Sequence, residues 1–127
     1  MNSWIIPCNV KFYDVINHFK NTDTIIWKRG IPAKNGDLVY LYVGIPYKQI
    51  LFRCQVIDEK LPEEEIGSEK YAIMKGSNTR LYMRLKLVEA WNEGIPLEKL
   101  NEFGIVLVRK QTRLTGSALN YISNYKE

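Results

Sequence analysis

The stretch that decides the fold is GDLVYLYVGIPYKQILFRCQVI, residues 36–57. Its part at 38–43 is an unbroken run of leucine, β-branched and aromatic residues, which is typical of a strand covered on both faces. From 50 to 57, apolar residues alternate with others in the period of a half-buried strand. We therefore predict a hairpin with a central first strand. The loop between its arms carries Pro46, Tyr47 and Lys48.

Before the hairpin, the sequence predicts a strand, a helix and a short extended segment. The strand at 3–6 ends at Pro7, because proline has no N–H to donate to a ladder. Asn9 is placed to cap the helix that follows. This helix has an apolar stripe at helical spacing, made of Phe12, Val15, Ile16 and Phe19. The extended segment at 24–27 leads into a basic loop at 28–30.

After the hairpin, the sequence predicts further short elements. They are an acidic loop at 58–69, a candidate strand at 71–74, a turn at 75–78, an alternating strand from Arg80 to Trp91, a break at 94–96, a helix at 97–103, a strand at 105–108, a basic linker at 109–113 and a helix from Thr115. This order predicts an α+β protein: a curled, mainly antiparallel sheet or pseudo-barrel with small helices at its rim. No linker divides the chain, so we expect one domain over 1–127.

Composition and charge narrow the class of protein. The chain has 127 residues, 46% hydrophobic and 25% charged, which is ordinary for a globular protein. No apolar run is long enough to span a membrane, and the N-terminus lacks the pattern of a signal peptide, so we expect a cytoplasmic protein without a membrane partner. In that compartment, Cys8 and Cys54 are expected to be buried thiols rather than a disulfide.

The charges are unevenly distributed along the chain. The net charge is +4, although residues 58–69 hold six acidic residues and one lysine. The rest of the chain is therefore strongly basic, which suits an anionic partner such as a nucleic acid. A solvated acidic loop on an otherwise ordinary basic protein explains the same charges, so charge alone leaves both interpretations open.

Evidence for catalysis is weak. His18 is the sole histidine, and it lies on the polar flank of the predicted helix, where a solvated side chain is the ordinary interpretation. Cys8, Cys54 and His18 have no metal-binding spacing, and there is no glycine-rich phosphate loop. One further set only superficially resembles a nuclease centre: Asp37, Asp58, Glu59 and Lys60. Its members fall in a turn and in the acidic loop. We expect no enzymatic activity, no metal and no cofactor.

Several features together resemble a known family. They are Trp4 in a short first strand, Trp27 followed by basic residues, GDLVYLYV at 36–43, and a basic residue before a closing helix at 113–122. Over nearly its whole length the chain is similar to the EVE domain, a member of the PUA-like group that also contains the YTH and SRA-type domains. The resemblance implies a barrel of five or six strands with a pocket for a modified base of DNA or RNA.

This sequence departs from the EVE pattern at two places, and both fall on that pocket. The usual lysine-serine-glutamate-proline after the first strand is replaced by Pro7, Cys8 and Asn9. The usual tryptophan-aspartate-glycine-valine-arginine-asparagine run is reduced to Trp27, Lys28, Arg29 and Gly30. These residues therefore take the positions of the pocket residues of the family.

The energetics of base extrusion require more than one aromatic contact. Taking a base out of a duplex costs a few kcal/mol, and one aromatic platform returns about 1–3 kcal/mol. Trp27 and Tyr47 are expected in loops beside the hairpin, while Trp4 is as well explained by core packing, and Trp91 is expected to be structural. Asn9 is a candidate to hydrogen-bond to a base edge, and the cations beside Trp27 are candidates to neutralise phosphates. The complete predicted site is Trp4, Pro7, Cys8, Asn9, Trp27, Lys28, Arg29, Tyr47, Lys48, Arg80 and Arg113.

Three interpretations of function follow. The first is a module that accepts a modified base of DNA or RNA, with methylation as the expected modification. Some EVE-like domains are the reading modules of modification-dependent restriction systems, so a separate nuclease or effector protein is a further partner to consider. The second is an RNA-binding PUA-like domain without modified-base specificity, with steep salt dependence. The third is a protein-interaction adaptor that uses the acidic loop, including Glu63, Glu64 and Glu65.

Overall fold

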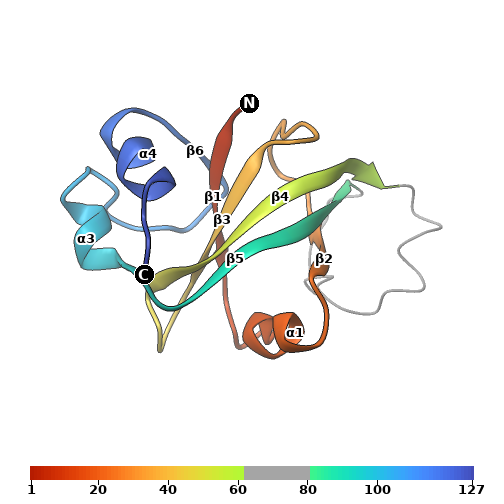
Figure 1. Cartoon of the computed structure of the whole chain (residues 1–127), viewed down its shortest axis with the longest axis horizontal. Coiled ribbons are helices and arrows are strands. Elements are labelled where there is room, and N and C mark those ends of the chain that lie inside the picture. The colour runs from red at the N-terminus through yellow and green to blue at the C-terminus, as the bar shows by residue number, and fades with distance from the viewer. Residues whose placement is uncertain (62–80) are drawn as a thin grey trace.

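The computed structural model describes residues 1–61 and 81–127. Figure 1 shows a long sheet with small helices around it. The elements in chain order are β1 (Ser3–Cys8), α1 (Val15–Asn21), β2 (Thr24–Lys28), β3 (Leu38–Val43), β4 (Gln49–Leu61), β5 (Tyr82–Pro96), α3 (Leu97–Asn101), β6 (Thr112–Leu114) and α4 (Gly116–Ser123). The strand and turn predicted at 71–74 and 75–78, most of the acidic loop, and Arg80 lie outside the described residues.

The strands form one six-stranded sheet in the order β2-β5-β4-β3-β1-β6. β1 and β3 are parallel, and the other neighbours are antiparallel. The predicted hairpin is confirmed, because β3 and β4 pair antiparallel at the centre of this order. The chain is therefore an α+β protein with a mixed, mainly antiparallel sheet, as its pattern of short strands and helices predicted.

Both faces of the central strands are buried, which explains why their sequences are almost wholly apolar. On one face, Ile6 of β1 and Leu41 of β3 belong to a core that also holds Val15 of α1. On the other face, Tyr40 belongs to a second core with Leu100 of α3 and Ile122 of α4. In Figure 1, α3 and α4 lie together at one side of the sheet and α1 lies at its lower end.

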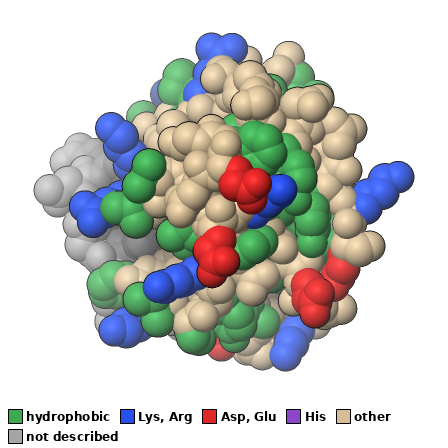
Figure 2. Space-filling view, turned by 90° about the vertical axis from the view of Figure 1, so that its left-hand side faces the viewer, with side chains coloured by type: hydrophobic (Ala, Val, Ile, Leu, Met, Phe, Trp, Pro, Cys, Tyr) green, Lys and Arg blue, Asp and Glu red, His purple; other side chains and the backbone are tan. Residues whose placement is uncertain are grey.

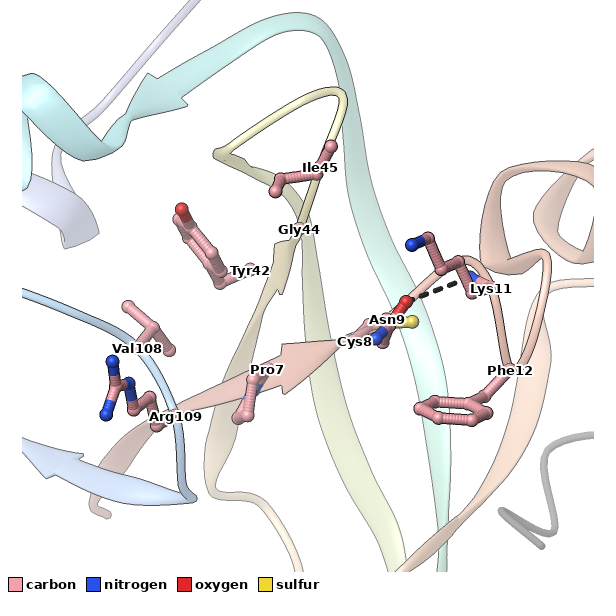
Figure 3. Close-up of a pocket in the computed structure, with 10 residues that line it drawn as sticks. All are labelled: Pro7, Cys8, Asn9, Lys11, Phe12, Tyr42, Gly44, Ile45, Val108 and Arg109. Carbon is pink, nitrogen blue, oxygen red and sulfur yellow. Dashed lines mark hydrogen bonds between the residues drawn. The ribbon is translucent and has the colours of Figure 1, made fainter.

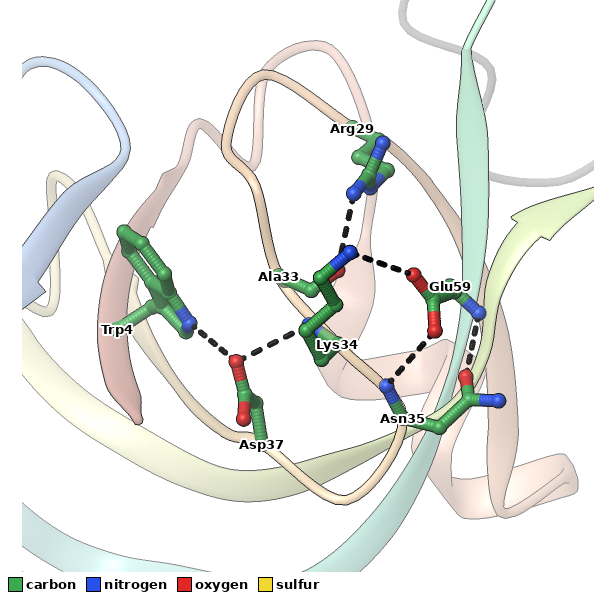
Figure 4. Close-up of polar contacts among 7 residues, drawn as sticks. All are labelled: Trp4, Arg29, Ala33, Lys34, Asn35, Asp37 and Glu59. Carbon is green, nitrogen blue, oxygen red and sulfur yellow. Dashed lines mark hydrogen bonds and ion pairs between the residues drawn. The ribbon is translucent and has the colours of Figure 1, made fainter. Parts of the chain in front are cut away.

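The turn before β3 is organised by a buried carboxylate. Gly36 has a φ of 93°, a conformation that glycine adopts without strain, and Asp37 follows it at 3% exposure. Asp37 accepts a hydrogen bond from the Trp4 indole nitrogen and one from the Lys34 amide (Figure 4). Trp4 is therefore a core residue, which was one of the two interpretations of this residue.

The first helix begins later than predicted. It starts at Val15, and its N-cap is Asp14, which accepts a hydrogen bond from the Asn17 amide. Asn9 instead accepts one from the Lys11 amide at 2.9 Å, so its side chain stabilises a turn. Phe12 consequently lies outside the helix, and it is 68% exposed rather than part of an apolar stripe.

The C-terminal half differs from prediction at two places. A break was predicted at 94–96, but β5 continues through Gly94 to Pro96. Glycine permits close contact between strands here, since a Cβ at Gly94 would lie 1.7 Å from the Ile50 carbonyl oxygen. The strand predicted at 105–108 is wrong. The last strand is β6, which overlaps the end of the predicted basic linker and pairs with β1. The helices predicted from 97 and from 115 are confirmed as α3 and α4. Among the described residues, no helix is long and apolar enough to cross a membrane.

Candidate functional site

A cavity of about 380 Å³ opens where β1 ends, and we call it the β1-end cavity (Figure 3). Its volume falls at the lower end of the range of about 300–1,000 Å³ that is usual for small-molecule sites. It is lined by Pro7, Cys8, Asn9, Lys11, Phe12, Tyr42, Gly44, Ile45, Val108 and Arg109. These residues come from three separate segments of the chain.

The parallel pairing of β1 with β3 brings two of these segments together. Cys8 and Val43 are register partners at the ends of the two strands, and the Gly44 amide donates to the Cys8 carbonyl oxygen at 2.9 Å. The chain therefore leaves both strands at the same level. In Figure 3, Ile45 lies on the β3 side of the cavity and Phe12 on the β1 side, with Cys8 between them.

The wall of the cavity is apolar and aromatic. Phe12 and Ile45 are 68% and 67% exposed, although both are large hydrophobic residues. Tyr42 is nearly buried and supplies a second aromatic ring. Large apolar side chains gathered at the mouth of a cavity mark a binding surface more often than a structural feature. The arrangement can hold a flat, partly apolar group.

Positively charged and amide groups lie beside this apolar wall. Lys11 and Arg109 contribute positive charges, and among residues 1–61 and 81–127 none that lines the cavity carries a carboxylate. The Asn9 amide nitrogen makes no hydrogen bond to the described part of the chain, and so it is available as a donor. The site can therefore attract an anionic ligand and hydrogen-bond to its polar edge.

The cysteine in the cavity is not an activated nucleophile. Burial, with a smaller contribution from the negative charge of Asp14, raises the pKa of Cys8 to about 12. Burial also raises the pKa of Tyr42, so its hydroxyl remains a neutral hydrogen-bond donor and acceptor at pH 7. Because reactive cysteines need a lowered pKa, Cys8 is not suited to act as a nucleophile.

Three residues of the predicted site meet here, and the aromatic residues do not. Pro7, Cys8 and Asn9 line the β1-end cavity together. The extended segment predicted at 24–27 is confirmed as β2, but the expectation that Trp27 stands beside a loop with an open ring is wrong. Trp27 pairs with Met83 and is 1% exposed, because its ring packs into the core. A ring in that position presents no open face on which a base could stack.

The other predicted residues are dispersed. Tyr47 is partly exposed and lines a different cavity together with Phe19 and Trp91. Lys48 lies in the β3–β4 loop with a φ of 52°. Arg29 donates to the Ala33 carbonyl oxygen at 3.0 Å, and Arg113 lies on β6. Lys28 lines a second cavity, which adjoins the first at Pro7 and Arg109.

Sequence analysis missed most of the cavity wall. The residues it did not select are Lys11, Phe12, Tyr42, Gly44, Ile45, Val108 and Arg109. Phe12 fitted a helical stripe and Tyr42 fitted a buried strand, so both were assigned to packing. Arg109 was part of the basic linker, and this charge was the one usable signal.

The face that carries α3 and α4 shows no continuous basic patch. In Figure 2, hydrophobic, basic and acidic side chains are mixed across this face. Lys99 of α3, for example, pairs with Glu102 at 3.4 Å and lies over the Phe103 ring. A polyanion would therefore gain little from lying across this side of the molecule.

Comparisons with known proteins support the fold. No family model matches the sequence, and no curated protein matches it. A hypothetical protein from Leishmania major is 14% identical, with a TM-score of 0.66 over 97% of this chain and 92% of that chain. Human THYN1 protein, solved in complex with 5-methylcytosine-containing DNA, is 12% identical, with a TM-score of 0.65 over 94% of each chain. ASCH from Zymomonas mobilis is 13% identical, with a TM-score of 0.59 over 94% of this chain and 92% of that chain. The chain thus has the PUA-like fold that its resemblance to the EVE domain implied.

Proposed function

We propose that this PUA-like chain is a non-catalytic module that binds nucleic acid by holding a modified base, methylated in the simplest case, in the β1-end cavity. The observation that carries the proposal is the exposed pair Phe12 and Ile45 at the mouth of a cavity with cations at its rim. The fold is shared with a protein that was solved with 5-methylcytosine-containing DNA, which favours the same class of ligand.

The chemistry of the wall suits a methylated base. Stacking on one aromatic ring contributes about 1–3 kcal/mol per base, and Phe12 is the exposed ring at this cavity. Ile45 offers an apolar contact for a methyl group, and Asn9 offers an amide donor to the base edge. Lys11 and Arg109 would neutralise the phosphates that flank the base.

The closure of the sheet and the extent of the domain belong to the same proposal. We infer that the sheet curls so that its two edge strands approach each other, with one domain over 1–127. This is supported by Gln111, just before β6, which donates from Nε2 to the carbonyl oxygen of Lys28 at the end of β2 at 3.0 Å. Such a curled sheet would place the β1-end cavity and its neighbour on the same side of the molecule.

A binding measurement with matched variants tests this proposal. Short DNA and RNA oligonucleotides with one methylated cytosine or adenine are titrated against unmodified strands by fluorescence anisotropy. We expect tighter binding of one methylated strand, and an affinity loss of about tenfold or more for Phe12→Ala, since 1.4 kcal/mol corresponds to tenfold. Val88→Ala is the control, because Val88 is exposed on β5 and lines neither cavity.

Two outcomes would contradict it. Equal affinity for every methylated and unmodified strand would remove modified-base specificity and leave the alternative of an RNA- or DNA-binding domain that recognises the backbone. Unchanged affinity of Phe12→Ala, with the circular dichroism spectrum preserved, would show that the β1-end cavity is not where the base binds. The same titration with Asn9→Ala would measure the contribution of the base edge, with the melting temperature as a control, because Asn9 Oδ1 also accepts from the Lys11 amide.

A further inference from the structure

We propose that the second cavity holds the backbone phosphate next to the bound base, so that the ligand is a strand rather than a free base or nucleoside. This inference rests on the proposed function for the position of the base. The second cavity, which we call the seam cavity, has a volume of about 360 Å³. It is lined by Pro7, Trp27, Lys28, Gly30, Arg109, Lys110 and Gln111.

The seam cavity is lined by positive charges from two distant parts of the chain. Lys28 ends β2, and Arg109 and Lys110 precede β6. Among the described residues, 1–61 and 81–127, none that lines the seam cavity is acidic, and none of them forms an ion pair with Lys28, Arg109 or Lys110. Three like charges around one hollow repel each other unless an anion lies among them. Their arrangement is explained by an anionic ligand.

The cavity is also held in shape. Gln111 accepts from the Gly30 amide through Oε1 at 2.7 Å and donates through Nε2 to the Lys28 carbonyl oxygen. It therefore ties the loop after β2 to the segment before β6 and holds the two basic segments together against their repulsion. Gly30 has no Cβ, and an added Cβ would lie 2.9 Å from Gln111 Oε1. Such preorganisation reduces the entropic cost of binding.

The lining favours a phosphate over a second base. Trp27 is 1% exposed, so the seam cavity offers no open ring for stacking. Arg109 provides a planar fork that matches phosphate oxygens, and the two lysines provide mobile point charges. Because Pro7 and Arg109 line both cavities, a strand with one base in the β1-end cavity passes the seam cavity directly.

The test compares a double variant with a charge-matched control. Lys28→Gln with Lys110→Gln is measured beside Lys86→Gln with Lys126→Gln, which removes two exposed lysines that line neither cavity. Three probes are used at several salt concentrations: a methylated oligonucleotide, the same strand unmethylated, and an abasic deoxyribose-phosphate oligomer. We expect the test variant to lose about tenfold in affinity for all three and to lower the salt slope by about 1–2, with a smaller effect of the control.

The probes separate this inference from the proposed function. If the abasic oligomer binds the wild type and binds the double variant more weakly, but methylation adds no affinity, the phosphate site in the seam cavity is supported and the proposed base site is contradicted. If the test and control variants behave alike on every probe, the phosphate site is overturned, whatever the effect of methylation. The phosphate site would also be overturned if the wild type bound a free methylated nucleoside as tightly as it binds the methylated strand.

Gln111→Ala tests the positioning role. We expect it to reduce affinity for the abasic oligomer several-fold and to lower the salt slope, although it removes no charge. A merely structural role would lower the melting temperature and leave the salt slope unchanged. Gln111→Glu, which keeps the acceptor for the Gly30 amide but places a negative charge in the cavity, should bind more weakly still.

Discussion

The Trp4 indole nitrogen donates a hydrogen bond to Asp37 Oδ2 at 3.0 Å, and this bond ties β1 to the turn that opens β3. Asp37 also accepts from the backbone amides of Asn2 and Lys34, each at 3.0 Å. Burial by itself raises the pKa of Asp37, but the hydrogen bonds, with the positive N-terminal amine, lower it below its ordinary value. Asp37 is therefore a buried, ionised hub for the N-terminal strand.

Replacing this carboxylate should destabilise the fold. The carboxylate oxygens of Asp37 accept from three N–H groups. In Asp37→Asn one of these oxygens becomes an NH₂ group, which cannot accept a hydrogen bond and faces an N–H donor. We therefore expect the free energy of unfolding at pH 7 to fall by about 1–3 kcal/mol. Urea unfolding followed by tryptophan fluorescence measures it. Asp23→Asn is the control, because Asp23 is exposed and its carboxylate has no partner among the described residues. Equal losses for both variants would contradict the role of Asp37.

The lowered pKa of Asp37 predicts that the free energy of unfolding falls at acidic pH. Because the pKa of Asp37 is lower in the folded state than in the unfolded state, its contribution is complete above the unfolded value and is lost as pH falls through the folded value. Unfolding free energy measured between pH 7 and pH 2 should therefore decline below about pH 4, the ordinary range for aspartate. In Asp37→Asn this decline should be shallower, and an identical pH dependence of the two proteins would argue against it.

Trp27 should behave as a core residue and not as a ligand contact. Trp27→Ala removes a fully buried ring, so we expect a loss of about 3–5 kcal/mol in stability, enough to unfold a marginal domain. Trp27→Phe keeps most of the packing and should retain the affinity for oligonucleotides. Thermal melts and anisotropy on both variants check this. A Trp27→Phe variant with native melting temperature and lost binding would restore the base-stacking role that the sequence suggested.

The central hairpin was predictable because its pattern is local. The run at 38–43 and the alternation from 50 show directly in the sequence which residues are buried, and β3 and β4 follow them. The last strand was not predictable in the same way. β6 has three residues and pairs with β1, more than a hundred positions earlier, so nothing in its own composition distinguishes an edge strand from a basic linker.

The site was only partly predictable for a related reason. Pro7, Cys8 and Asn9 were selected because they follow the first strand, and the structure places them in one cavity. Trp27 was assigned to a loop because its neighbours are basic, but its burial depends on the pairing of β2 with β5, which a single sequence does not reveal. Phe12 shows the opposite error, since helical spacing suggested burial where the chain is still in a turn.

Arg53 should anchor the C-terminal helix on the sheet. Its guanidinium donates to the Tyr40 hydroxyl at 3.2 Å and to the Ser123 carbonyl oxygen at 3.1 Å, and it lies over the Trp91 ring. Arg53→Met retains the aliphatic contact but leaves these partners unsatisfied, so we expect a loss of about 1–3 kcal/mol. Denaturant unfolding measures it. Lys86→Met, an exposed change on β5, should have little effect, and a similar effect for both would refute the anchor.

Cys8 provides a chemical probe of the β1-end cavity. Because burial raises its pKa to about 12, little thiolate is present at pH 7, and iodoacetamide should modify the native protein slowly. The rate should rise about tenfold per pH unit while the fold persists, since thiolate is the reacting form. Mass spectrometry of the Cys54→Ala variant isolates this signal. A bound methylated strand should slow the reaction, because Cys8 lines the cavity proposed for the base. Rapid labelling at pH 7 would contradict the burial of Cys8, and a rate that a saturating strand leaves unchanged would place the ligand elsewhere.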